Sequence, residues 1–130
     1  MKILVGFDGS NSSKAALELA CTYAKALDAQ LAIVTSLAEK DSDDAKEITQ
    51  AEDKLKWAKS YAEGAGITCA SHLLVRGMTP GEDLVQFASE KSVDAVFIGV
   101  KRRSRVGKIL FGSNAQYTIV KAHCPVMTVK

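Results

Sequence analysis

The chain has 130 residues, the size of a single domain with a substantial buried core, and we expect residues 1–130 to form one domain. Hydrophobic residues make up 47% and charged residues 25% of the sequence, and the formal net charge of +2 is too small to indicate nucleic-acid binding. The apolar runs are too short for a membrane span or a signal peptide, so we expect no membrane insertion.

The first 37 residues have the pattern of a strand, a helix and a second strand. Residues 2–7 are an apolar run followed by a turn, which predicts a buried parallel strand. Ser10, Asn11 and Ser12 are all good N-cap residues, and the helical spacing of apolar residues over 16–27 predicts a helix after them. A second apolar run, residues 31–37, predicts the next strand. Together they predict a β-α-β unit with a right-handed crossover.

The middle of the chain adds a helix and a strand. The acidic residues 39–44 predict a solvated connection whose charges suit the start of a helix. Apolar residues then recur in steps of three and four over residues 45–65, which predicts a helix that ends at Gly64 or Gly66. Residues 67–75 predict a third strand.

The last third of the chain continues the alternation. Thr79 is a good N-cap for a helix over residues 82–91, and the apolar residues 94–98 predict a fourth strand. We expect a final helix over residues 113–122 and a short fifth strand over residues 125–129. Strands and helices therefore alternate from end to end, which predicts a doubly wound α/β fold with a parallel sheet between two layers of helices.

In such a fold, ligands bind at the carboxyl ends of the strands, where the strand order reverses. Asp8-Gly9-Ser10 follows the first predicted strand, and the segment that begins at Gly99 follows the fourth. If these two strands are neighbours, the two segments face each other across a crevice. The sequence thus predicts a ligand site between them.

The segment from Gly99 to Ser113 is strongly basic. It carries Lys101, Arg102, Arg103, Arg105 and Lys108. The free N–H groups and the positive dipole end of the helix that follows favour an anion such as phosphate. A solvated basic loop that binds nothing is the alternative, but the flanking glycines in this fold favour a nucleotide.

Other phosphate-binding motifs are excluded. Gly107-Lys108 resembles the end of a Walker A loop, but Ile109 stands where Ser or Thr should bind magnesium. No G-x-G-x-x-G stretch supports a nicotinamide or flavin Rossmann site. The serine-rich turn after the first strand lacks the aromatic pair that a flavodoxin-type site would need.

Three segments, residues 3–10, 99–113 and 124–129, resemble the universal stress proteins, and the resemblance extends over the whole chain. Its most specific part is the nucleotide motif G-x2-G-x9-G-[ST], in which Arg102 replaces the second glycine. The resemblance implies a five-stranded sheet of order 3-2-1-4-5, as in adenine nucleotide alpha hydrolase-like proteins. It also implies a homodimer and adenine nucleotide binding.

The resemblance further implies which residues contact the nucleotide: Gly6, Phe7, Asp8, Ser36, Ile98, Gly99, Lys101, Arg102, Arg103, Gly112, Ser113 and Asn114. Asp8 would lie near the ribose and the adenine, Gly6 and Phe7 would lie against the base, and Ser36 would line the adenine pocket. Ile98 and Gly99 would lie under the ribose and the first phosphate. Residues 112–114 would present N–H and hydroxyl groups to the phosphates, and the basic side chains would favour a triphosphate.

Arg102 leaves two functions open. If its side chain swings away or contacts phosphate, the protein is a regulator or sensor that binds ATP, with or without Mg²⁺. If it obstructs the site, the protein is a dimeric interaction module without nucleotide. A nucleotide alpha-phosphate enzyme is a third reading, but its S-G-G-x-D-S loop is absent. Because no residue is placed as a general base, ATP hydrolysis is expected to be slow or dependent on a partner.

The resemblance also implies partners. The last strand, residues 125–129, is expected to lie at an edge of the sheet and to pair with its copy in a homodimer. We further expect an unidentified regulatory protein partner. Three widely spaced cysteines without a C-x-x-C pair indicate no zinc site or disulfide framework and favour a cytoplasmic location. His72 and His123 lack neighbours at ligand spacing and are expected to be structural.

Overall fold

A computed structural model describes residues 1–38, 41, 43–100 and 112–130 of the chain. The strands are β1 (Lys2–Gly6), β2 (Gln30–Ser36), β3 (Cys69–Leu74), β4 (Ala95–Gly99) and β5 (Val126–Val129). The helices are α1 (Asn11–Leu27), α2 (Ala45–Gly64), α3 (Pro80–Glu90) and α4 (Ser113–Lys121). Every predicted element is present, with bounds that differ from the predicted ones by a few residues at most.

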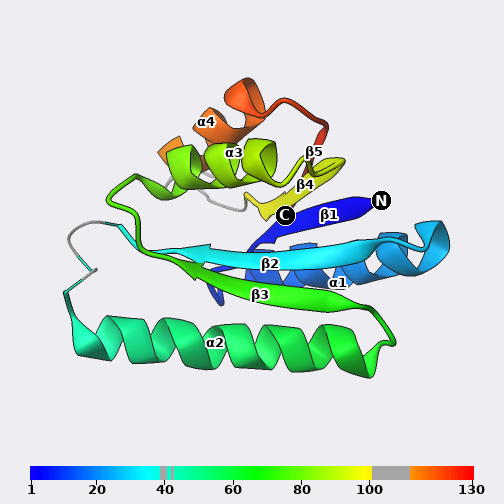
Figure 1. Cartoon of the computed structure of the whole chain (residues 1–130), viewed down its shortest axis with the longest axis horizontal. Helices are drawn as coiled ribbons and strands as arrows, with labels where there is room; N and C mark the ends of the chain where they lie inside the picture. The colour runs from blue at the N-terminus through cyan, green and yellow to red at the C-terminus, as the bar shows by residue number, and fades with distance from the viewer. Residues whose placement is uncertain (39–40, 42, 101–111) are drawn as a thin grey trace, which may run out of the picture.

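The five strands form one parallel sheet of order β3-β2-β1-β4-β5 (Figure 1). β1 lies at its centre, with Val5 opposite Ile33 of β2 and Phe97 of β4. The chain therefore winds from β1 toward β3 and then returns to the other side of β1. This confirms the predicted fold and strand order, and it makes β1 and β4 neighbours.

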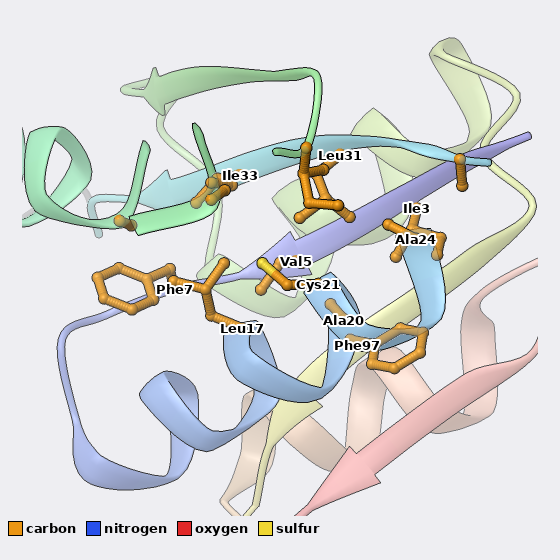
Figure 2. Close-up of a cluster of buried hydrophobic side chains, with 14 of the residues drawn as sticks. Ile3, Val5, Phe7, Leu17, Ala20, Cys21, Ala24, Leu31, Ile33 and Phe97 are labelled. Carbon is orange, nitrogen blue, oxygen red and sulfur yellow. The ribbon is translucent and has the colours of Figure 1, made fainter. Parts of the chain in front are cut away.

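Two layers of helices cover the sheet, α1 and α2 on one face and α3 and α4 on the other (Figure 1). The alternation of side chains along β1 divides the core between them: Ile3 and Val5 face α1 and α2, whereas Leu4 faces α3. Figure 2 shows the cluster on the α1–α2 face, where Leu17 packs among the strand residues. All four of these side chains are almost fully buried.

Helix capping agrees with the sequence. The Ser10 hydroxyl accepts a hydrogen bond from Ser13 N and caps α1, and Asp44 caps α2 in the same way. Thr79 and Glu82 form a reciprocal capping box at the start of α3. α2 ends at Gly64, and Gly66 has a φ of +82° that few other residues adopt.

Among the described residues, none of the helices combines the length and apolar character that a membrane span requires.

Candidate functional site

A pocket of about 200 Å³ opens at the carboxyl ends of β1, β2 and β4, beneath the first turns of α3 and α4. Seven of the twelve residues expected to contact a nucleotide line it: Gly6, Phe7, Asp8, Ser36, Ile98, Gly99 and Asn114. Gly112 and Ser113 immediately precede Asn114 at the start of α4 and are not among the lining residues. Lys101, Arg102 and Arg103 lie outside the described residues.

Gly6 creates the space for the pocket. It follows Leu4 on the α3–α4 face of β1, two residues further along the strand. A Cβ atom at Gly6 would lie 3.0 Å from Cδ1 of Leu84 and 3.2 Å from Cγ2 of Ile98, two other pocket residues. A larger residue would therefore fill the floor of the pocket, where the apolar core of this face stops.

The wall formed by β2 carries two hydroxyl groups. Thr35 donates a hydrogen bond to the carbonyl of Phe7, 2.5 Å away, and thereby ties the end of β2 to the end of β1. Ser36 donates to Oδ2 of Asp83 in α3 over 2.7 Å. The polar groups of this wall are thus held in fixed orientations.

Asp8 supplies a carboxylate at the mouth of the pocket. Its Oδ1 accepts a hydrogen bond from Ser10 N at 2.9 Å. Partial burial on its own raises the pKa of Asp8, but hydrogen bonds from Ser10 and Ser13 and the positive charge of Lys54 outweigh it, so the pKa lies below its ordinary value. Asp8 is therefore ionised at neutral pH and can accept hydrogen bonds.

The predicted nucleotide motif has two described glycines, Gly99 and Gly112, and the structure requires glycine at only the first of these positions. A Cβ at Gly99 would overlap the start of α1, coming within 2.6 Å of both Ser12 Oγ and Ser13 N, so packing alone demands glycine there. Gly112, the N-cap of α4, has φ −65° and ψ 157°, which any residue can adopt. Backbone conformation therefore gives no reason for glycine at position 112.

A contact between helices fixes the start of α4 beside the pocket. Gly81 in the first turn of α3 donates its N–H to Oδ1 of Asn114 over 2.9 Å. A Cβ at Gly81 would lie 2.9 Å from the carbonyl oxygen of Asn114, so the close approach of the two helices depends on this glycine. The predicted binding residue Asn114 thus also has a structural role.

Charged residues that were not predicted from the sequence lie behind the pocket. Asp83 is fully buried, and its Oδ1 accepts from Nε of Arg76 at 2.6 Å. Arg76 also donates to Glu90 at 2.8 Å. Hydrogen bonding to Glu90 and to Asp83 outweighs partial burial and raises the pKa of Arg76, and the pKa of Glu90 is lowered by the same contact with Arg76.

One signal could have located these residues: Asp83 directly precedes the apolar stripe of its helix, and Arg76 stands in the turn before it. A buried carboxylate needs a partner of opposite charge, so the two belong together. Their contact with Ser36, however, joins residues from two distant parts of the chain.

The two histidines pack against neighbouring elements of the fold. His72 packs against Phe87 with ring centroids 5.0 Å apart, and His123 Nε2 lies 3.1 Å from the carbonyl oxygen of Val93. Burial raises the pKa of Cys21 to about 11, which keeps it a thiol. Among the described residues, no group of three or more His, Cys, Asp or Glu side chains is arranged to hold a metal ion.

Comparison with known proteins places this geometry in a family. The model of the universal stress protein family matches residues 1–130. A universal stress protein of Methanocaldococcus jannaschii is 31% identical over 140 aligned positions, which cover 99% of this chain and 81% of the relative.

Two solved structures from Archaeoglobus fulgidus are similar along the whole chain. The structure of a universal stress protein has a TM-score of 0.92 and 36% identity and covers 100% of this chain and 98% of its own. The structure of a universal stress protein in complex with dAMP has a TM-score of 0.85 and 33% identity, with the same coverage.

Proposed function

The chain belongs to the universal stress protein family, and we propose that it binds an adenine nucleotide, ATP in particular, in the pocket at the carboxyl ends of β1, β2 and β4. The observation that carries this proposal is the convergence of Gly6, Asp8, Ser36 and Ile98 on one pocket at the point where the strand order reverses. The complex of a relative with dAMP supports adenine as the base.

The pocket offers a suitable group for each part of a nucleotide. The apolar floor between Leu84 and Ile98 suits a purine ring, and the ionised Asp8 suits the ribose hydroxyls. The start of α4 presents the positive end of its dipole and the Ser113 hydroxyl to the phosphates. The backbone conformation of Gly112 does not require glycine. In this proposal its role is to leave room for a phosphate oxygen to approach the backbone.

ATP is proposed over AMP because of the basic side chains of Lys101, Arg102 and Arg103, which would stabilise additional phosphate charge. Mg²⁺ would be held by phosphate oxygens and water more than by protein side chains, as is usual for this ion with nucleotides. We propose a regulatory or sensing role in the cytoplasm, where the three free cysteines remain reduced.

Calorimetric titration of the protein and of a Gly112→Leu variant with ATP tests the site. We expect the variant to lose at least about tenfold in affinity, because the leucine side chain occupies the space of a phosphate at a position where the backbone tolerates it. Gly64→Leu is the matched control, since a Cβ at Gly64 meets nothing within 4 Å and the site is remote from the pocket. Equal affinity in the protein and both variants would refute phosphate binding at α4. An absence of heat with all three would favour the interaction module without nucleotide.

We also propose a homodimer formed through β5. This strand lies at an edge of the sheet, and the carbonyls of Pro125 and Val129 bond to β4. Because alternate residues of a strand face each neighbour, Val126 and Thr128 direct their N–H groups to the open edge. Pairing with the β5 strand of a second copy would satisfy these groups.

Thr128→Pro removes one of these donors without touching the bonds to β4. Sedimentation should show a dimer for the protein and for the control Thr128→Ala, and a monomer for the proline variant. A dimer that survives Thr128→Pro would place the interface elsewhere.

A further inference from the structure

The hydroxyl of Ser36 lies where the proposed nucleotide pocket meets a buried ion pair. Ser36 follows Val34 on the α3–α4 face of β2, so its side chain points toward α3 and the pocket. Its Oγ is 2.7 Å from Oδ2 of Asp83, a side chain with no exposed surface. The state of Asp83 therefore determines how Ser36 directs its proton.

Arg76 fixes the state of Asp83. Its Nε and Nη2 atoms both lie 2.6 Å from Oδ1 of Asp83, and Nη2 also donates to the backbone carbonyl of Asp83 at 3.3 Å. A guanidinium group has only donors and does not lose its proton in proteins, so its permanent charge stabilises the carboxylate form of an Asp bonded to it. Asp83 is thus ionised, with Oδ1 bonded to Arg76 and Oδ2 to Ser36.

An ionised carboxylate has no proton to donate, and so the short bond between Ser36 and Asp83 uses the proton of Ser36. The hydroxyl has a single proton, which leaves only its lone pairs for a ligand. Ser36 consequently presents an acceptor to the pocket. A hydroxyl without such a partner would rotate and serve as donor or acceptor.

We propose that Ser36 is a specificity-determining residue that selects purines with an N–H donor at carbon 6, and that Asp83 and Arg76 are positioning residues that hold it in the acceptor state. The inference rests on the proposed nucleotide function of the pocket. Adenine carries an amino group at carbon 6, whereas hypoxanthine and guanine carry a carbonyl oxygen, which is an acceptor. Two acceptors facing each other lose the hydrogen bond and leave both groups desolvated.

The acceptor can be tested with a ligand pair that differs at one position. AMP and purine riboside 5′-monophosphate are identical except at carbon 6, where the second has a hydrogen atom. Calorimetry should give a dissociation constant about tenfold lower for AMP, the value of one good hydrogen bond. In Ser36→Ala this ratio should fall to within about twofold of one. A ratio near one in the unmodified protein, or an unchanged ratio in Ser36→Ala, would overturn the proposal.

The role of Asp83 can be tested by reversing the direction of the hydrogen bond. In Asp83→Asn, Arg76 still requires an oxygen, so the amide nitrogen must face Ser36 and donate to it. Ser36 then directs its proton into the pocket and becomes a donor. The preference for AMP over IMP should fall by at least about tenfold, an effect that a merely structural role for Asp83 would not produce.

Glu90→Gln is the matched control, because it removes the other acidic partner of Arg76 at the surface and leaves the Asp83 contacts in place. It should keep the preference of the unmodified protein. Should Asp83→Asn fail to fold, as judged by circular dichroism, the Ser36→Ala ratio decides the proposal. If the unmodified protein binds no nucleotide at all, the proposed function fails and this inference with it. Tight binding of all three ligands without preference refutes the inference alone.

Discussion

Two described helices cover each face of the sheet, but the two faces differ in polarity. On the α1–α2 face, Leu17 and Leu55 pack against Val5 and Ile33 in an apolar cluster (Figure 2). On the α3–α4 face, the apolar cluster ends at Gly6, and beyond it lie the pocket and the buried carboxylate of Asp83. The first face stabilises the domain, whereas the second combines stability with a polar site.

The difference follows from single positions in the strands. Leu4 and Gly6 occupy successive places on the same face of β1, yet only the first contributes a large side chain to the core. In β2 the same face ends in Ser36, whose hydroxyl bonds to α3. A small or polar residue at the carboxyl end of a strand thus turns the end of a core into a pocket. Substitutions on the two faces should therefore affect stability and binding differently.

The largest effect is expected on the apolar face. Leu17→Ala should lower the free energy of unfolding by about 2–5 kcal/mol, because it removes a fully buried side chain and leaves a cavity. Urea unfolding can be followed by fluorescence, since the chain has a single tryptophan, Trp57, which stacks on Phe7. The folded fraction should bind ATP with unchanged affinity. A large change in affinity would mean that the two faces are coupled.

The second effect concerns the ion pair on the polar face. Arg76→Met should cost about 2 kcal/mol, because the buried Asp83 loses its charged partner, although the partial exposure of Arg76 lessens the cost. Glu90→Gln, which affects an exposed pair of the same arginine, should cost much less, because solvent screens that pair. Equal losses in the two variants, measured in urea, would show that burial of Asp83 is not what makes the contact matter.

A smaller effect is expected at the start of α3, the helix that carries Asp83. Thr79→Ala removes the N-cap and one half of the capping box, and it should cost about 1 kcal/mol. Ser10→Ala removes the corresponding cap of α1 on the other face. Thermal unfolding of both variants should show similar losses. A much larger loss for Thr79→Ala would indicate that the cap also supports the ion pair.

The smallest effect depends on pH. The pKa of Asp8 is lower in the folded protein than its unfolded value of about 3.9. Its contribution to stability is therefore fully present above the unfolded pKa and is lost as the pH falls through the folded pKa. Asp8→Asn should flatten this acid limb of a stability profile and leave the slope above pH 5 unchanged. An identical acid limb in the variant would show that Asp8 is not held in its charged form.

Local patterns explain why so much of the fold could be predicted. Capping depends on residues within one turn, so the sequence predicts Thr79 as one N-cap and narrows the other to Ser10, Asn11 or Ser12, of which the structure has Ser10. The pocket could be anticipated because Asp8 and Gly99 both end strands of a parallel sheet. The resemblance to a family supplied Ser36, which no local pattern singles out.

Contacts between residues that are far apart in the sequence could not be predicted and are known only from the structure. The contact of Asp83 with Ser36 joins α3 to the end of β2, and no spacing in the sequence encodes it. The packing requirement for glycine at position 99 likewise comes from Ser12 and Ser13 at the start of α1, more than eighty residues earlier in the chain. Motif matching alone does not reveal this packing requirement.

The most direct test of the account is to denature freshly purified protein, identify any released nucleotide by chromatography and titrate the emptied protein with ATP. We predict a co-purified adenine nucleotide, or a dissociation constant in the micromolar range or below. No released nucleotide and no heat up to millimolar ATP would contradict the assignment of the pocket as a nucleotide site.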